Sequence, residues 1–321
     1  MLLSRVADHL YWAARYLERA EDTARLVRSY TDLVIDLPIG VLSSWEPMLA
    51  VVGGADLIDE SRQGEVLGEL PIVRFLVSDE SNPSSIASSI AAARENLRIT
   101  REVMPREAWQ TVNDLHLHAA ANAEGGVERR SRARFLTRVI RDCQQFDGVL
   151  TTVMTRDEAY ELWRLGQSIE RADMTTRVVG VRAAALLGSV RSTVSGDDRS
   201  VSGMHDDVQW MGLLRSVSAL QMYQRVQRGS LDGAGAVTFL LYARSFPRSV
   251  ASCADRIRQA LERLPQPEVT LPAVDRLDAV LDSDPLRVDD GASLDAAMDR
   301  VQSALAGVND AVARAFVRSG T

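Results

Sequence analysis

The chain has 321 residues, is 46% hydrophobic and 25% charged, and carries a formal net charge of −7. A chain of this length can bury a large core without a disulfide or a metal ion, and it lacks the basic footprint typical of nucleic-acid-binding proteins. No apolar run approaches the roughly 20 residues of a membrane-spanning helix, and the first residues do not resemble a signal peptide. The sequence therefore predicts a cytoplasmic protein without a nucleic-acid or membrane partner.

All 37 basic residues are arginine, so no lysine amine is available for acylation. The planar guanidinium group donates two parallel hydrogen bonds to a carboxylate, which suits every basic side chain of this protein to carboxylate binding. The two cysteines, Cys143 and Cys253, stand far apart in apolar helical patterns and are predicted to be buried, free thiols.

Apolar residues recur at helical spacing along most of the chain, and no stretch alternates as a β-strand would. The predicted class is all-α: a bundle of about ten helices, several of them long, in a single domain over residues 1–321. In chain order, helices are expected at 3–35, 40–52, 65–77, 83–104, 106–121, 128–154, 157–187, 206–228, 234–244, 247–264 and 293–318, with a short one at 273–281.

Polar residues mark several of the expected helix boundaries. Asn82, which precedes a proline, is a predicted N-cap, and so are Asp157 and Ser293. Residues 188–203, rich in serine, glycine and charge, are predicted to form a mobile loop. Residues 265–292 are rich in proline and aspartate and are expected to be largely irregular.

One stretch of the first helix recurs later in the chain. Residues 18–25, Glu-Arg-Ala-Glu-Asp-Thr-Ala-Arg, match residues 170–177, Glu-Arg-Ala-Asp-Met-Thr-Thr-Arg. The repeat predicts two similar halves, about 1–155 and 156–321, that reflect an internal duplication or two equivalent, neighbouring helices.

On each helix the repeat gathers acids and one arginine on one side, while Arg19 and Arg171 point about 100° away. The residues of that polar side are Arg15, Glu18, Glu21, Asp22 and Arg25 in the first copy, and Gln167, Glu170, Asp173 and Arg177 in the second.

Three interpretations of this polar side are open. It can be the solvated side of two surface helices, held by weak pairs such as Glu21–Arg25 and Asp173–Arg177. The two copies can instead meet, so that each glutamate binds an arginine of the other copy in a buried network that fixes helix register. The cluster can also form a ligand or metal site between the helices.

The sequence favours neither a metal nor a cofactor. Di-metal carboxylate bundles pair a glutamate with a histidine three residues later, whereas Glu18 is followed by Glu21 and Glu170 by Asp173. The neighbouring arginines would compete with a hard cation for these four carboxylates. No phosphate-binding glycine loop, dinucleotide-binding pattern or nucleophile elbow occurs.

Further polar candidates lie outside the repeat. Arg94 and Asn96 stand on a helix whose apolar side is already filled. Arg248 stands at a helix start, from which it could reach an acidic group, while free backbone amides there would favour an anion. The complete set of predicted binding residues is Arg15, Glu18, Arg19, Glu21, Arg25, Arg94, Asn96, Glu170, Arg171, Asp173, Arg177 and Arg248, with Glu18 and Glu170 as catalytic candidates.

These residues carry a resemblance to a known family. Because the matching pieces follow in order over most of the chain, the sequence resembles the Alpha-E family, bacterial all-helical proteins named for a Glu-Arg motif. The pieces are residues 10–21, 82–86, 93–96, 109–115, 170–173 and 246–250.

The resemblance implies a functional setting. Members of this family are typically encoded beside, or fused to, a circularly permuted ATP-grasp ligase, and a transglutaminase-like protein and sometimes a proteasome-like hydrolase accompany them. The family is thus expected to serve a system that forms amide bonds and makes or attaches a peptide-like product. The implied functional centre is the Glu-Arg pair, here Glu18, Arg19, Glu170 and Arg171.

Three functions are compatible with the sequence. The first, which we favour, is a non-catalytic helical partner of the ligase that holds an amino-acid-like or peptide ligand, because arginines and carboxylates together bind both ends of a zwitterion. The second is an enzyme in which desolvated Glu18 or Glu170 is a general base and Arg19 and Arg171 bind an anionic substrate. The third is a purely structural interaction bundle.

Overall fold

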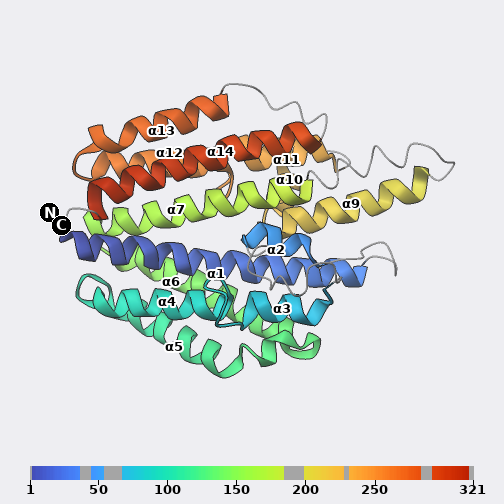
Figure 1. Cartoon of the computed structure of the whole chain (residues 1–321), viewed down its shortest axis with the longest axis horizontal. Helices are drawn as coiled ribbons and strands as arrows, with labels where there is room; N and C mark the ends of the chain where they lie inside the picture. Colours follow the sequence, from blue (N-terminus) through green and yellow to red (C-terminus); the bar gives the residue numbers. More distant parts are fainter. Residues whose placement is uncertain are drawn as a thin grey trace.

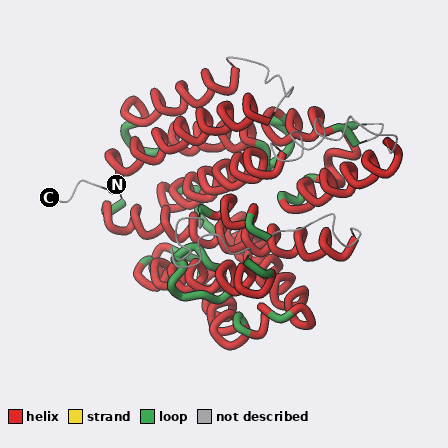
Figure 2. The backbone as a smooth tube through the Cα atoms, turned by 45° about the vertical axis from the view of Figure 1, so that its right-hand side comes forward, coloured by secondary structure: helices red, strands yellow, loops and turns green. Residues whose placement is uncertain are grey.

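The structure is a computed structural model that describes residues 2–36, 45–53, 67–183, 199–227, 231–282 and 291–317. Over these residues the chain forms thirteen α-helices and no β-strand, which confirms the predicted all-α class (Figure 2). In chain order the helices are α1 (Ser4–Asp36), α2 (Pro47–Val52), α3 (Glu69–Val77), α4 (Ile86–Ile99), α5 (Arg106–Asn122), α6 (Arg129–Val153), α7 (Glu158–Val178), α9 (Arg199–Ser216), α10 (Leu220–Val226), α11 (Gly233–Tyr242), α12 (Val250–Arg263), α13 (Pro267–Asp282) and α14 (Gly291–Val312).

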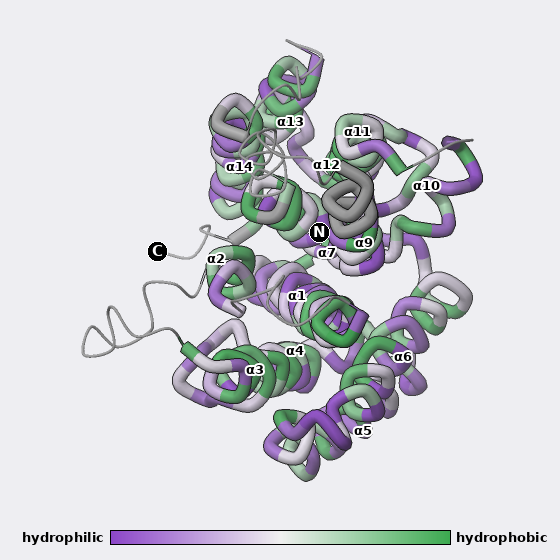
Figure 3. The backbone as a smooth tube through the Cα atoms, turned by 90° about the vertical axis from the view of Figure 1, so that its right-hand side faces the viewer, coloured by the Kyte–Doolittle hydropathy of each residue, from purple (hydrophilic) through white to green (hydrophobic). Residues whose placement is uncertain are grey.

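Helices α1 and α7 lie side by side at the centre of the molecule and run in the same direction (Figure 1, Figure 3). The backbone amide of Leu2, just before α1, donates to Glu158 at the start of α7 over 2.6 Å. The two helices approach closely at Gly166, where a β-carbon would overlap the carbonyl oxygen of Tyr11. This parallel contact sets the two copies of the repeat next to each other.

Each central helix carries its own covering helices. Helix α4 packs on α1 and is followed by α5 and α6, whereas α12 packs on α7 and is followed by α13 and α14. Seen from the end, the first set lies on one side of the central pair and the second set on the other (Figure 3). The intervening segments cross over, since α2 follows α1 but contacts α7, and α9 follows α7 but packs on α1.

The covering helices α4 and α12 begin in the same way. Ser85 caps α4 by accepting a hydrogen bond from the Ser88 amide, and Ser249 caps α12 by accepting one from the Ser252 amide, each at 3.1 Å. The prediction of Asn82 as the N-cap is therefore wrong. Its side chain forms the turn before the helix and donates to the Phe75 carbonyl oxygen at 2.9 Å.

Two segments expected to be irregular are more helical than predicted. Helix α13 extends over Pro267–Asp282, although Pro272 lies inside it. Its buried side contains Ala273, Val274 and Leu277, and this apolar burial against α12 and α14 outweighs the hydrogen bond that the proline lacks. Helix α9 begins at Arg199, within the expected loop.

The remaining boundary predictions are mixed. Asp157 caps α7 as predicted, accepting hydrogen bonds from the amides of the second and third residues beyond it. Helix α14 begins at Gly291, two residues before the predicted cap Ser293. The helix expected at 40–52 begins, within the described residues 45–53, at Pro47. Parts of that helix, of the helices predicted at 65–77, 157–187, 206–228 and 293–318, of the predicted loop and of the 265–292 segment lie outside the described residues.

The core is built from the apolar stripes that the sequence shows. In α12, for example, Val250, Ala254, Ile257 and Leu261 recur at helical spacing and are at most 1% exposed. The prediction for the cysteines is confirmed, since both thiols are free and buried. Among the described helices, none is long and apolar enough to span a membrane.

Candidate functional site

The two Glu-Arg motifs exchange partners across the α1–α7 contact. Arg171 donates two hydrogen bonds to Glu18, from Nε at 2.7 Å and from Nη2 at 2.8 Å. Arg19 donates in the same manner to Glu170, at 2.6 Å and 3.1 Å. The glutamates are buried, with exposed fractions of 2% and 1%. Of the three interpretations, the structure therefore shows the buried network, in which each arginine binds the glutamate of the other copy.

An arginine from the turn before α12 closes the network around Glu18. Arg248, directly before α12, lies 3.1 Å from Glu18 and 3.3 Å from Glu21, and it also pairs with Asp22. The predicted reach of Arg248 to an acidic group is thus confirmed. The Thr175 hydroxyl of α7 donates to the Arg248 carbonyl oxygen at 3.0 Å and fixes the backbone there. We call Glu18, Glu21, Asp22, Arg171 and Arg248 the closed cluster.

Burial disfavours charge on the acids of this region, and the arginines decide which of them stay ionised. Burial alone would raise the pKa of Glu18, but Arg171 and Arg248 outweigh it and hold that pKa at about 2. For Asp22, burial prevails over Arg248 and raises the pKa to about 7. Burial, together with the charge of Glu18, raises the pKa of Asp147 on α6 to about 6. Asp22 and Asp147 therefore titrate near neutrality, whereas Glu18 stays ionised.

The network around Glu170 is built differently. Arg15 of α1 donates to Glu170 at 2.7 Å and to Asn309 of α14 at 2.9 Å. Near it on α7, Asp173 pairs with Arg177 at 3.0 Å, and the Arg177 side chain is 34% exposed. This cluster therefore reaches the surface. We call Arg15, Arg19, Glu170, Asp173 and Arg177 the open cluster.

The electrostatics bear on the catalytic role considered for the two glutamates. A general base works best with a pKa near the working pH. Burial acts to raise the pKa of Glu170, but Arg19 and Arg15 outweigh it and lower that pKa. Since the pKa of Glu18 is lowered as well, both carboxylates are stably ionised and accept hydrogen bonds from guanidinium groups. This arrangement favours ion pairing over proton transfer.

The within-copy pairs expected from the spacing are present, but their surroundings differ from those of a solvated surface. Arg25 pairs with Glu21 and Arg177 with Asp173. Glu21 is only 3% exposed, so the interpretation as a wet helix face is wrong for the first copy. Its pair with Arg25 belongs to the rim of the closed cluster.

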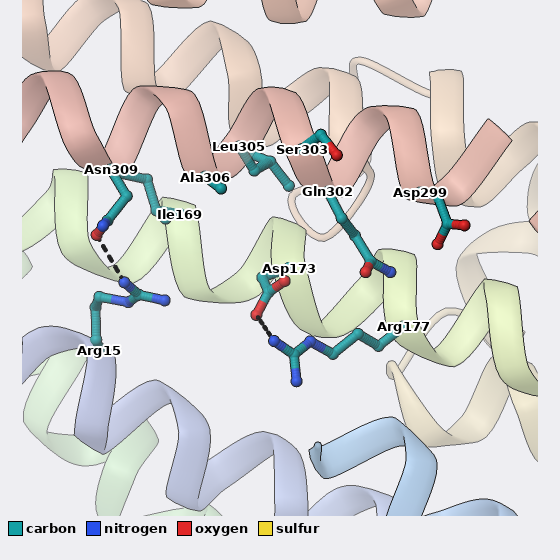
Figure 4. A pocket seen from close by; sticks show the side chains of 10 residues that line it. All are labelled: Arg15, Ile169, Asp173, Arg177, Asp299, Gln302, Ser303, Leu305, Ala306 and Asn309. Carbon is teal, nitrogen blue, oxygen red and sulfur yellow. Dashed lines mark hydrogen bonds and ion pairs between the residues drawn. The ribbon is translucent and has the colours of Figure 1, made fainter. Parts of the chain in front are cut away.

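Two hollows adjoin the open cluster. An outer groove of about 600 Å³ lies between α1, α7 and α14 (Figure 4), and an inner cavity of about 230 Å³ lies towards α2 and the start of α4. Arg15, Asp173 and Arg177 line both hollows. The other residues of the outer groove are Ile169, Asp299, Gln302, Ser303, Leu305, Ala306 and Asn309, and those of the inner cavity are Arg19, Thr23, Val52, Gly53, Ser84, Glu170 and Met174.

Two predicted site residues lie elsewhere. The Arg94 guanidinium donates to Asn113 of α5 at 3.0 Å and stacks over Trp109, with 5.6 Å to the ring centre. The Asn96 amide donates to the Ala92 carbonyl oxygen at 2.8 Å. These contacts join α4 to α5 and stabilise α4 itself, and within the described ranges neither side chain joins the closed or the open cluster.

The chemistry of the clusters favours arginine over a metal ion. In the part of the chain that the structure describes, no three histidine, cysteine, aspartate or glutamate side chains are grouped as metal ligands would be. The carboxylates of both clusters accept hydrogen bonds from guanidinium groups instead.

Sequence reasoning missed the residues that α14 contributes. Asp299, Gln302 and Asn309 line the outer groove, but they belong to an ordinary amphipathic pattern with no motif. A signal was available for Thr23, because it belongs to the repeat and matches Thr175. Ser84 was part of the matching segment at the start of α4 without being singled out.

The comparisons with known proteins identify a family with a Glu-Arg motif. The chain is 22% identical over 291 residues to uncharacterized proteins of Mycobacterium bovis and Mycobacterium tuberculosis. The match covers 81% of this chain but 30% of each relative, so the chain spans less than a third of their length. No solved structure shows a significant match. A family described as a predicted alpha-helical domain with a conserved ER motif, Alpha-E, matches residues 2–317. The chain belongs to the Alpha-E family.

Proposed function

We propose that this protein is a non-catalytic, ligand-holding partner of a circularly permuted ATP-grasp ligase in a system that forms amide bonds. In this proposal it holds an amino acid or a peptide in the outer groove. The ligase, and a transglutaminase-like protein in the same system, are partners implied by the family resemblance. The ligand-holding role is supported by the charge layout of the groove.

The outer groove offers opposite charges at a distance from each other. Arg15 lies towards one end and Asp299 at the other, with the Asp173–Arg177 pair between them (Figure 4). Arg15 already donates from Nε to Glu170 and from Nη1 to Asn309, so a ligand carboxylate would be held by its charge and by the Nη2 group. Asp299 would accept hydrogen bonds from the ammonium group of the ligand. A zwitterionic amino acid or peptide is complementary to this layout.

The acidic end of the groove is reinforced by a second carboxylate. Asp295 and Asp299 line an adjoining hollow of about 350 Å³ together with Arg177 and Gln302. Burial and the repulsion of Asp299 raise the pKa of Asp295, so a cationic group placed between these two aspartates would relieve their repulsion. The amine of the ligand fits this end.

A holding role also agrees with the state of the Glu-Arg network. Glu18 and Glu170 are ionised and bound by arginines, so they supply rigid geometry rather than a proton acceptor. Rigid, paired arginines next to a groove position an anionic ligand without reacting with it.

The first experiment measures ligand binding. Isothermal titration calorimetry with glutamate, alanine and alanyl-alanine is expected to show saturable binding to the wild type and weaker binding to Asp299→Asn. Asp310→Asn, which removes another exposed acid of α14, is the matched control and is expected to bind like the wild type. Equal binding by both variants, or no binding by the wild type, would contradict the ligand-holding role.

The second experiment measures the partnership. Purified chain and ATP-grasp ligase are expected to co-elute, and the chain is expected to increase amide-forming turnover of the ligase. A ligase that turns over equally with and without the chain, and forms no complex with it, would overturn the proposed partnership.

A further inference from the structure

We infer that the inner cavity is a binding site for a small oxyanion, a carboxylate or a phosphate group, held by Arg177, Thr23 and Ser84. The role of this oxyanion as the anchoring group of a larger ligand rests on the proposed function. Oxyanion binding itself can be measured on the chain alone. The inference comes from comparing the inner cavity with the matching position in the closed cluster.

The internal repeat allows that comparison residue by residue. The starts of α4 and α12 also match, because Asn-Pro-Ser-Ser-Ile at 82–86 and Phe-Pro-Arg-Ser-Val at 246–250 place their capping serines at the same position. Ser84 therefore occupies in the first half the position of Arg248 in the second. Both precede a helix that packs on a central helix carrying the repeat.

This exchange explains why the space before α4 is empty while the matching space before α12 is filled. In the closed cluster the Arg248 side chain extends to Glu18, Glu21 and Asp22 and fills the space before α12. The short side chain of Ser84 leaves the matching space before α4 empty, and it lines the inner cavity. The cavity is thus the place where an internal guanidinium is missing.

The closed cluster and the inner cavity differ in their balance of positive and negative side chains. The closed cluster and Arg25 set three guanidinium groups against the carboxylates of Glu18, Glu21 and Asp22. Around the inner cavity, Met174 stands at the position that Asp22 has in the other copy, and Arg15 stands at the position that Gln167 has in the other copy. Among the residues that line this cavity, three guanidinium groups therefore face two carboxylates, and the surplus positive charge calls for an anion rather than a second cation.

Hydrogen-bond donors without partners point the same way. Thr23 is 0% exposed, and its hydroxyl has no hydrogen-bond partner among the described residues, although Thr175, its match, donates to the Arg248 carbonyl oxygen. The buried Nε of Arg177 likewise lacks a partner there. A buried donor loses its hydration without compensation unless a ligand or water accepts from it. Thr23 of α1 and Arg177 of α7 both line this cavity, and a hydroxyl and a guanidinium Nε are together suited to an oxyanion.

The size of the cavity limits what enters. Its volume of about 230 Å³ lies below the roughly 300–1,000 Å³ of pockets that enclose a whole ligand. One carboxylate or phosphate group fits, and the rest of a ligand would extend past Arg15, Asp173 and Arg177 into the outer groove. Gly53 at the end of α2 covers Arg177, since a β-carbon there would lie 2.9 Å from Nη1.

The test is calorimetric titration of the full chain with inorganic phosphate, acetate and glutamate. Thr23→Val is expected to weaken oxyanion binding about tenfold, the effect of one lost hydrogen bond of roughly 1.4 kcal/mol, while keeping wild-type stability. Thr175→Val is the matched control, expected to bind like the wild type because its hydroxyl serves the closed cluster. Arg177→Gln is expected to weaken binding further, whereas Arg138→Gln, which breaks a comparable aspartate–arginine pair on α6, is not.

The possible outcomes separate the two proposals. Binding of phosphate but not of acetate or glutamate supports the oxyanion site and overturns an amino-acid ligand, and binding of all three supports both. If none of the three binds saturably, or if Thr23→Val and Arg177→Gln both bind as tightly as the wild type, the oxyanion site is refuted. The ligase partnership is then decided separately by turnover.

Discussion

The closed and open clusters are two versions of one arrangement. In both, a buried glutamate of one central helix accepts paired hydrogen bonds from an arginine of the other. In the closed cluster a further arginine from the start of α12 fills the remaining space. In the open cluster the matching residue is Ser84, and a cavity and a groove remain. Both clusters join the central helices, and under our proposal the open cluster also keeps the same geometry accessible to a ligand.

The largest expected effect comes from removing the arginine that closes the first cluster. Arg248→Met leaves Glu18, Glu21 and Asp22 crowded in a buried site with one fewer cation. Breaking a buried ion network in this way costs about 3–5 kcal/mol. Chemical denaturation should show a loss in this range. A loss below about 1 kcal/mol would mean that the closed cluster is not a stabilising lock.

The pH dependence of stability should come mainly from the closed cluster. Because burial raises the pKa of Asp22 to about 7, above the 3.8 of an ordinary aspartate, the folded state binds a proton that the unfolded state releases. Its contribution is present below pH 4 and is lost as the pH rises through 7, by up to about 4 kcal/mol. Burial also raises the pKa of Asp147 to about 6, so its contribution to stability is likewise lost as the pH rises through 6.

Asp22→Asn is expected to reduce the decline of stability between pH 4 and pH 7. Urea unfolding at several pH values measures this decline. Asp310→Asn, an exposed acid of α14, serves as the control and should leave the decline unchanged. An identical pH profile for Asp22→Asn and the wild type would show that Asp22 does not bind the proton.

The two matching threonines should respond differently in stability. Thr175→Val removes a hydroxyl that donates to the Arg248 carbonyl oxygen, and the lost hydrogen bond is expected to destabilise the protein by about 1 kcal/mol. Thr23→Val removes a buried hydroxyl without a partner among the described residues and should be neutral or slightly stabilising. Thermal unfolding of both variants measures this difference, and equal losses would remove the distinction between the clusters.

The smallest effect is expected at the rim of the open cluster. The Arg177 side chain is 34% exposed and pairs with Asp173 within one helix, and such pairs contribute less than about 1 kcal/mol. Arg177→Gln should therefore leave the free energy of unfolding nearly unchanged, as should Arg138→Gln. A loss as large as that of Arg248→Met would place Arg177 among the structural residues.

Much of the fold could be predicted because helical periodicity is a local signal. The long apolar stripes gave the all-α class, and the position of Asp157 before α7 identified its cap. The extent of α13 could not be predicted, since the packing of Ala273, Val274 and Leu277 against neighbouring helices overrides the local effect of Pro272.

The site was predictable only in part, for a related reason. The repeat singled out Glu18 and Glu170, and spacing alone predicted the Asp173–Arg177 pair. The sequence leaves partner exchange between the copies open as one of three interpretations, because the exchange depends on the parallel contact of α1 and α7, which no local pattern specifies. The contribution of Asn309 depends on α14 returning to α1 from the far end of the chain, and its sequence context gives no sign of this.

The most direct test of the account is to convert the open cluster into a closed one. Ser84→Arg combined with Met174→Asp supplies the arginine and the acid that Arg248 and Asp22 supply at the matching positions. The added guanidinium then has an acidic partner, and its side chain should occupy the inner cavity. Titration calorimetry with inorganic phosphate and with glutamate is predicted to show binding to the wild type and none to the double variant, with circular dichroism confirming an intact helical fold. A folded double variant that binds these ligands as tightly as the wild type would contradict the account.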